Sequence, residues 1–256
     1  MDFWMPFLAA LLAGSGILYP FWARPLWHDA PASRLLKNAA SVAFILPGLA
    51  TTLIWIQRPL LEIQWAALVW TLATLAVVLY NRAVSPSWTL LWIPSLFGIR
   101  VFIRLTTIQL PVYPRWLFFL YWLLVGSLTV QLILMGLNTG EECSPGLAAR
   151  TRYWLLTLLG LRWLWDGTVL ILFTTEDDYG LSLSLYRFLV QNELRMILVY
   201  ALTGWFIPVT LALVRVVFGS RWKGRSRTVL DSALAVSVCI SLGLSAYFLL
   251  TYGYVL

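Results

Sequence analysis

Long apolar runs, separated by short polar stretches, repeat along the whole chain. A helix that crosses about 30 Å of hydrocarbon needs roughly 20 such residues. The predicted spans are Phe3 to Trp22, Leu36 to Ile56, Trp65 to Tyr80, Trp88 to Ile103, Trp116 to Leu137, Tyr153 to Thr175, Met196 to Phe218 and Val229 to Tyr252. These runs are too long for barrel strands and lack their apolar/polar alternation. The pattern predicts an all-α, polytopic integral membrane helical bundle, a single multi-pass transmembrane domain over residues 1–256.

The fourth run leaves the number of spans open between eight and seven. It is short, contains Pro94 and holds Arg100 near its end, so a re-entrant or interfacial helix is the alternative. Eight spans place ten Lys and Arg residues on one side and six on the other, whereas seven spans divide them nine to seven. Because Lys and Arg collect in cytoplasmic loops, the charges favour eight spans, with both ends of the chain outside the cytosol.

Composition and charge agree with a membrane protein. Hydrophobic residues make up 61% of the 256 residues and charged residues 11%, whereas soluble domains carry about 25% charged residues. The formal net charge is +7, but no basic run is long enough for a nucleic-acid groove, and the nearest is the short stretch Arg221 to Arg227. The expected partner is therefore membrane lipid and not nucleic acid.

Few residues could hold a metal or a cofactor. His28 is the one histidine of the chain, so a haem held by two histidines, or a copper or di-iron oxidase centre, is excluded. Two acidic stretches, Glu141-Glu142 and Glu176-Asp177-Asp178, are separated by one predicted span and should lie on opposite membrane faces. That separation argues against a magnesium–diphosphate site. No metal and no cofactor is predicted.

Charged residues inside or beside the spans are the candidates for chemistry, because a charge in hydrocarbon is costly. Asp166 lies in the middle of the sixth span, and Arg162 lies four residues earlier on the same helix face. The two form either a purely structural ion pair or a functional site. Glu62 and Asp231 lie at span ends, where headgroup contact or helix capping would also explain them. Arg215 is expected to extend its guanidinium to the interface.

The chain holds 15 Trp residues, and those at span ends fit the aromatic belt of the membrane interface. Others fall at or inside spans, where a belt does not explain them: Trp70, Trp92, Trp122, Trp163, Trp165 and Trp205. We expect these six, together with Arg162, to bind a lipophilic small-molecule substrate. The longest connection, Glu176 to Arg195, begins acidic and continues with an amphipathic pattern, which predicts a segment lying on the membrane surface.

In length, number of spans, aromatic content and buried acids, the chain resembles the small polytopic terpene cyclases of fungal meroterpenoid pathways. Their Asn-x-x-Trp-Glu pattern is absent, and the nearest string, Glu62-Ile63-Gln64-Trp65, has the reverse order. No catalytic residue is therefore carried over by motif. The resemblance implies a membrane-bound lyase or isomerase of isoprenoid biosynthesis in secondary metabolism.

The function expected from these residues is cyclisation or isomerisation of an isoprenoid-type substrate, started by protonation. Asp166 would be the acid only if Arg162 points elsewhere, because a nearby cation favours the carboxylate. Glu62 or Asp231 would otherwise take its place, and indole faces would stabilise the carbocation. Two alternatives stay open. The lack of any motif favours a non-catalytic subunit of a larger membrane complex, and the Pro-interrupted spans favour a small transporter.

Overall fold

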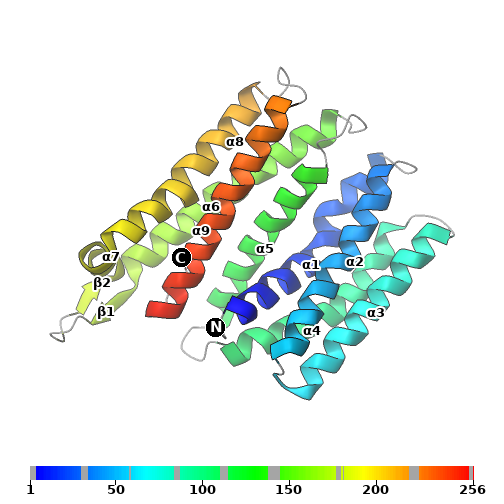
Figure 1. Cartoon of the computed structure of the whole chain (residues 1–256), viewed down its shortest axis with the longest axis horizontal. Helices are drawn as coiled ribbons and strands as arrows, with labels where there is room; N and C mark the ends of the chain where they lie inside the picture. Colours follow the sequence, from blue (N-terminus) through cyan, green and yellow to red (C-terminus); the bar gives the residue numbers. More distant parts are fainter. Residues whose placement is uncertain are drawn as a thin grey trace. The chain divides into compact units, whose positions relative to one another are not determined.

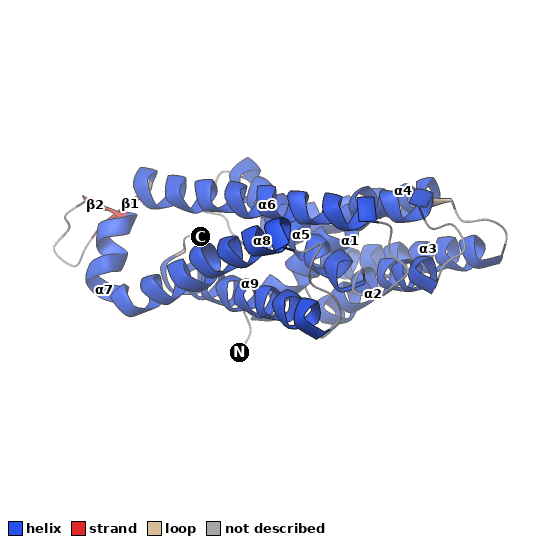
Figure 2. Cartoon of the chain, turned by 90° about the horizontal axis from the view of Figure 1, so that it is seen from above, coloured by secondary structure: helices blue, strands red, loops and turns tan. Residues whose placement is uncertain are grey.

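The computed structural model describes residues 4–29, 34–57, 59–83, 87–109, 115–137, 145–176, 180, 182–218, 225–253 and 256. Helices make up nearly all of this described chain (Figure 1), and β1 and β2 are its strands (Figure 2). In chain order the elements are α1 (Trp4–Asp29), α2 (Arg34–Gln57), α3 (Leu61–Ala83), the 3-10 helix η1 (Trp88–Leu91), α4 (Trp92–Gln109), α5 (Arg115–Leu137), α6 (Pro145–Leu172), β1 (Thr174–Glu176), β2 (Ser182–Ser184), α7 (Leu185–Ala201), the π-helix η2 (Leu202–Phe206), α8 (Ile207–Phe218) and α9 (Arg225–Tyr252).

Eight helices among the described residues are long and apolar enough to cross a membrane. The predicted fold class, an all-α bundle with eight such helices, is confirmed. The disputed fourth run forms one of them, a helix of 19 residues from Trp88 to Thr106. Pro94 is the third residue of α4 and comes shortly after the 3-10 helix η1, and α4 continues past it to Gln109.

The chain forms two compact units, Met1–Thr151 and Arg152–Leu256. The first unit contains α1 to α5, and the second contains most of α6 together with α7, α8 and α9. The single membrane domain expected from the sequence stays a prediction.

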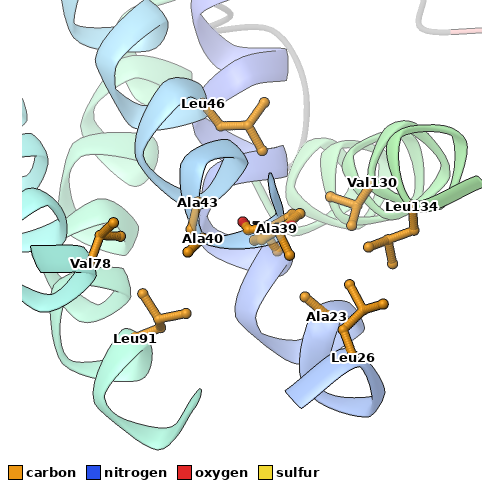
Figure 3. Packing of buried hydrophobic residues seen from close by; sticks show 11 residues of the cluster. Ala23, Leu26, Ala39, Ala40, Ala43, Leu46, Val78, Leu91, Val130 and Leu134 are labelled. Atoms are coloured by element: carbon orange, nitrogen blue, oxygen red, sulfur yellow. Dashed lines mark hydrogen bonds between the residues drawn. The ribbon is translucent and has the colours of Figure 1, made fainter. Parts of the chain in front are cut away.

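Small side chains let the helices of the first unit approach one another. There α1 contacts α2, α4 and α5, while α3 contacts α2 and α4. Alanines of α2 (Ala39, Ala40 and Ala43) lie among the larger apolar side chains of the other helices (Figure 3). Tyr19 Oη of α1 donates a hydrogen bond of 2.9 Å to the backbone carbonyl of Ala39. Close helix packing with a polar link is typical of helices that associate in lipid.

Threonine hydroxyls join α2 to α3. Thr51 Oγ1 donates to the carbonyl oxygen of Ala67 at 3.0 Å, and Thr71 Oγ1 donates to that of Pro47 at 3.1 Å. Pro47 lies inside α2, which nevertheless continues to Gln57. These bonds hold the two helices side by side.

The second unit contains a sharp change of helix direction. The strands β1 and β2 pair antiparallel, with Thr175 opposite Leu183, and α7 follows directly. Glu193 interrupts α7 with non-helical backbone angles, φ −135° and ψ 38°, which kink the helix. The ribbon of α7 is bent (Figure 2). The candidate span Leu185–Phe218 has 34 residues, more than the roughly 20 that a crossing needs. The kink separates a short first part, with Leu185 and Leu189 buried, from the part long enough to cross.

Pro208 explains the π-helix η2, which follows α7 and precedes this proline. Ile207 N–H bonds to the carbonyl of Leu202, five residues earlier, so the next bond of this kind would need an N–H at Pro208, which proline lacks. The carbonyl of Thr203 is left over, and Ser237 Oγ of α9 donates to it at 2.7 Å. The π-helix is therefore fixed by a hydroxyl from a neighbouring helix.

Candidate functional site

A buried pair of charges lies at the centre of the site. Asp166 and Arg162, one turn apart on α6, are 0% and 1% exposed. Arg162 Nε lies 3.8 Å from Asp166 Oδ2, which is within ion-pair range but longer than a hydrogen bond. The shared helix face predicted from the spacing of these residues is confirmed. Arg162 does not point elsewhere, so the condition set for Asp166 as an acid is not met in its simple form.

One oxygen of Asp166 receives two strong donors. Tyr200 Oη of α7 donates to Oδ2 at 2.6 Å, and Trp205 Nε1 of the π-helix donates to the same oxygen at 2.8 Å. The other oxygen, Oδ1, is buried and has no hydrogen-bond partner among the described residues. Buried carboxylate oxygens are nearly always paired. The asymmetry between Oδ2 and Oδ1 therefore marks Oδ1 as the place where a ligand or a proton would be held.

The guanidinium of Arg162 links α6 to two other helices. Its Nη2 donates to Ser245 Oγ of α9 at 2.8 Å and to Tyr200 Oη at 3.2 Å. Tyr200 thus accepts from the cation and donates to the anion. The resulting network joins Arg162, Asp166, Tyr200, Trp205 and Ser245, all in the second unit, and we call it the Asp166 cluster.

Aromatic rings form part of this cluster and pack against it. The rings of Tyr200 and Trp205 meet edge to face with centroids 6.1 Å apart, and those of Tyr200 and Phe248 do so at 5.7 Å. The faces of such rings attract a positive charge. A developing cation next to Asp166 would therefore meet aromatic surface, beside the hydroxyls of Tyr200 and Ser245.

The structure adds two residues to the site that the spacing around Asp166 along the chain does not indicate. Tyr200 and Ser245 were not among the predicted residues, although Ser237, Ser241 and Ser245 recur at four-residue intervals and so share a face of α9. That polar stripe in an apolar span was the available signal. Ser241 Oγ is buried without a hydrogen-bond partner among the described residues.

The two tryptophans beside Asp166 in sequence lie apart from its carboxylate. Trp163 is 54% exposed, so its side chain points away from the buried face of α6. Trp165 is partly buried and packs against the apolar cluster that contains Val169 and Leu170. The helix geometry explains both positions, because neither residue is three or four places from Asp166.

Three further predicted tryptophans, Trp70, Trp92 and Trp122, belong to the first unit, and two of them pack in its interior. Trp70 is fully buried, and a Cβ at Gly98 would lie 2.6 Å from its ring. Trp122 is also buried, with its ring centroid 5.1 Å from that of Phe7. Trp92 is exposed. A role of these three side chains in substrate binding stays a prediction.

The two substitute acids differ in their surroundings. Glu62 is exposed in the first turn of α3, where its charge favours the helix N-terminus. Asp231 is buried and its Oδ1 lies 3.0 Å from Arg215 Nε. The expectation that Arg215 extends to the interface is wrong, because this guanidinium is buried against a carboxylate. Asp231 lies 14 residues before Ser245 on α9, about 21 Å along the helix axis, so it is not part of the Asp166 cluster.

A further carboxylate, Glu193, lies at the kink of α7 and was missed by the sequence argument. Tyr247 Oη and Tyr252 Oη of α9 donate to its Oε1 at 3.0 and 2.9 Å. Glu193 thereby ties the turn in α7 to the end of α9. Within the described ranges, no three His, Cys, Asp or Glu side chains come together as a set of metal ligands would. His28, Glu141, Glu142, Asp177 and Asp178 have side chains outside the described part.

Comparison with protein-family models, with curated proteins and with solved structures gave no match to this chain.

Proposed function

We propose that this chain is a multi-pass integral membrane protein whose second unit is an enzyme site for a lipophilic, isoprenoid-type substrate. The membrane location is supported by the placement of polar and apolar side chains. Asp166, Arg162, Arg215 and Asp231 are buried, whereas Ile171 and Leu172 are each 71% exposed. The four charges are buried as ion pairs, as charges inside a membrane usually are, and extensive exposed apolar surface is typical of a membrane-facing helix. Hydrocarbon around the helices accounts for both features.

The observation that supports the reaction is the asymmetry of the Asp166 carboxyl. Oδ2 accepts from Tyr200 and Trp205, so a proton on this carboxyl would sit on Oδ1. Hydrogen bonds to Oδ2 stabilise the carboxylate that remains after the proton leaves. Asp166 protonated at Oδ1 is therefore a stronger acid than an isolated buried carboxyl, as protonation of an alkene requires.

Arg162 adds to this effect and sets its limit. The cation stabilises the carboxylate, which strengthens the acid but lowers the share of molecules that carry the proton. The distance of 3.8 Å and the bonds of Arg162 to Tyr200 and Ser245 moderate the attraction.

The reaction that fits this site needs no co-reactant. The proton of Oδ1 adds to one carbon of an alkene, the cation at the other carbon is attacked by a second alkene to form a ring, and a neighbouring carbon returns a proton to the carboxylate. Product and substrate have the same mass. The rings of Trp205, Tyr200 and Phe248 would stabilise the cation between these steps. Loss of the proton without ring formation gives an isomer.

A small transporter is the second candidate, and the seventh candidate span favours it. That span contains the Glu193 kink, the π-helix and Pro208, and interrupted helices near buried charges are typical of transporter binding sites.

The deciding experiment uses membranes from cells that express the chain, supplied with prenylated or epoxidised polyenes. If the chain is the proposed enzyme, we expect the wild type to form a cyclic or isomeric product of unchanged mass and Asp166→Asn to form none. Asp231→Asn is the matched control, because it neutralises the other buried, arginine-paired carboxylate of the same unit. Circular dichroism establishes that each variant folds. No product from any polyene, or full activity of a folded Asp166→Asn protein, contradicts the proposal and favours a transporter or a non-catalytic subunit.

A further inference from the structure

We propose that the first unit holds an anionic phospholipid where the end of α3 lies beside the beginning of α2. This inference rests on the membrane location proposed above and does not depend on the reaction at Asp166. Arg82 Nη2, in the last turn of α3, donates to Ser41 Oγ of α2 at 2.9 Å. Ser41 Oγ in turn bonds to the backbone carbonyl of Lys37 at 3.0 Å, one turn earlier on the same face of α2.

The two cations suit the phosphate of a lipid headgroup. Arg82 and Lys37 are both exposed, and Ser41 between them has a hydroxyl. Guanidinium and ammonium groups bind phosphate oxygens directly. Within the described part of the first unit, Glu62 is the acidic residue whose side chain is placed. It lies at the opposite end of α3. Among the described side chains, no acid lies at this end of the unit, and Asp29, which ends α1 there, has its side chain outside the described part.

Exposed apolar side chains directly below the cations would contact the acyl chains of the same lipid. Ile45 lies one turn after Ser41 on α2 and is 48% exposed, and Leu79 lies three residues before Arg82 on α3 and is 53% exposed. Both therefore share the helix face of the polar residue above them. The polar group at the helix ends and the apolar surface next to it match a phospholipid, whereas a free phosphate ion would use only the cations.

Arg24 provides a control at the same end of the unit. Its guanidinium carbon lies 4.8 Å from the ring centroid of Trp88. The residue next to this ring, Ser87, is joined to Asn81 of α3 by hydrogen bonds of 3.1 and 3.2 Å, so Arg24 and Arg82 belong to the same end. Arg24 is exposed and has the same charge as Arg82, but it contacts an aromatic ring and not the α2–α3 junction.

The test measures lipid binding to the purified full chain by native mass spectrometry. The protein in neutral detergent is titrated with phosphatidylglycerol and, separately, with phosphatidylcholine of the same acyl chains. We expect phosphatidylglycerol to bind more tightly. Arg82→Gln and Lys37→Gln should each weaken its binding about tenfold, the change expected when one hydrogen bond to a charged group is lost, whereas Arg24→Gln should change it little. Arg82→Lys, which keeps the charge, should retain most of the binding and shows that the fold persists.

Three results would overturn the inference. Equal loss in Arg24→Gln would show that only the overall charge matters. Equal binding of both lipids would show that the phosphate group is not selected. Displacement of phosphatidylglycerol by glycerol phosphate at equal concentration would show that the acyl chains add nothing and that the cations bind free phosphate. Failure of the membrane location would be seen separately, as a chain that stays in solution without detergent.

Discussion

Asp166 and Asp231 are both buried aspartates paired with an arginine of the second unit, and the two pairs differ in distance. Asp166 Oδ2 has Tyr200 and Trp205 as donors. Asp231 is held close to Arg215 at 3.0 Å, as a purely structural ion pair would be. The longer distance between Arg162 and Asp166 indicates that this pair is arranged around the donors from other helices.

The first prediction concerns the stability of the Arg162–Asp166 pair. Asp166→Ala leaves the guanidinium of Arg162 buried without its counter-charge, which should lower the free energy of unfolding by about 3–5 kcal/mol. The double variant Arg162→Met/Asp166→Leu removes both charges and should recover most of that loss. Thermal unfolding in detergent, followed by circular dichroism, measures both. A double variant less stable than Asp166→Ala would show that the charges themselves stabilise the fold.

Tyr200 supplies the second prediction, because its hydroxyl joins the cation to the anion. Tyr200→Phe keeps the ring contacts with Trp205 and Phe248 but leaves Asp166 Oδ2 with one donor fewer. The loss of stability should be about 1–3 kcal/mol, as for other buried groups that lose a hydrogen-bond partner. The proposed enzyme should also lose activity, since the acid is weakened. Tyr247→Phe is the control, because that hydroxyl bonds to Glu193 and not to the cluster; equal loss of activity in the control would contradict the role of Tyr200.

The π-helix is the element that brings Trp205 to the carboxylate. Leu202–Phe206 inserts an additional residue into the helix ahead of Pro208, and π-helices of this kind often lie at functional sites. Its close contact with α9 depends on Gly204, where an added Cβ would meet Ser241 Oγ. The close packing of the π-helix against α9 is thus needed for the Asp166 cluster to form.

The third prediction tests that approach. A Cβ at Gly204 would lie 2.5 Å from Ser241 Oγ and 3.3 Å from Ser241 Cβ. Gly204→Ala should therefore destabilise the protein by about 1–3 kcal/mol through overpacking. In the double variant Gly204→Ala/Ser241→Gly the clashing atoms are gone, and we expect more than half of the loss to be recovered. Thermal unfolding of the four proteins in the cycle provides the measurement. Equal destabilisation in the single and double variants would show that the effect arises from the backbone of the π-helix instead.

At the scale of the whole molecule, the helices could be predicted and the site only in part. Apolar runs long enough for the bilayer determine helices almost by themselves, since backbone groups in hydrocarbon must bond within the segment. The pairing of Arg162 with Asp166 also follows from local spacing. Tyr200 and Ser245 come together with Asp166 only through packing between helices, which no local spacing encodes. The tryptophans of the first unit show the converse, because an unexplained excess of Trp is partly accounted for by packing against Gly98 and Phe7.

The last prediction concerns the orientation of the chain in the membrane. Eight crossing helices, the number found in the described chain, place the two ends of the chain on the same side. Arg24, Lys37 and Arg82 lie at the end of the first unit where α1 and α3 finish and α2 begins. Because Lys and Arg mark the cytoplasmic side, this end should face the cytosol and both ends of the chain should face away from it. Protease treatment of sealed vesicles, with a tag on either end, measures this. Both tags should be digested only from the non-cytosolic face. Tags on opposite faces would mean an odd number of crossings, and the helix formed by Trp88 to Thr106 would then be the one that does not cross.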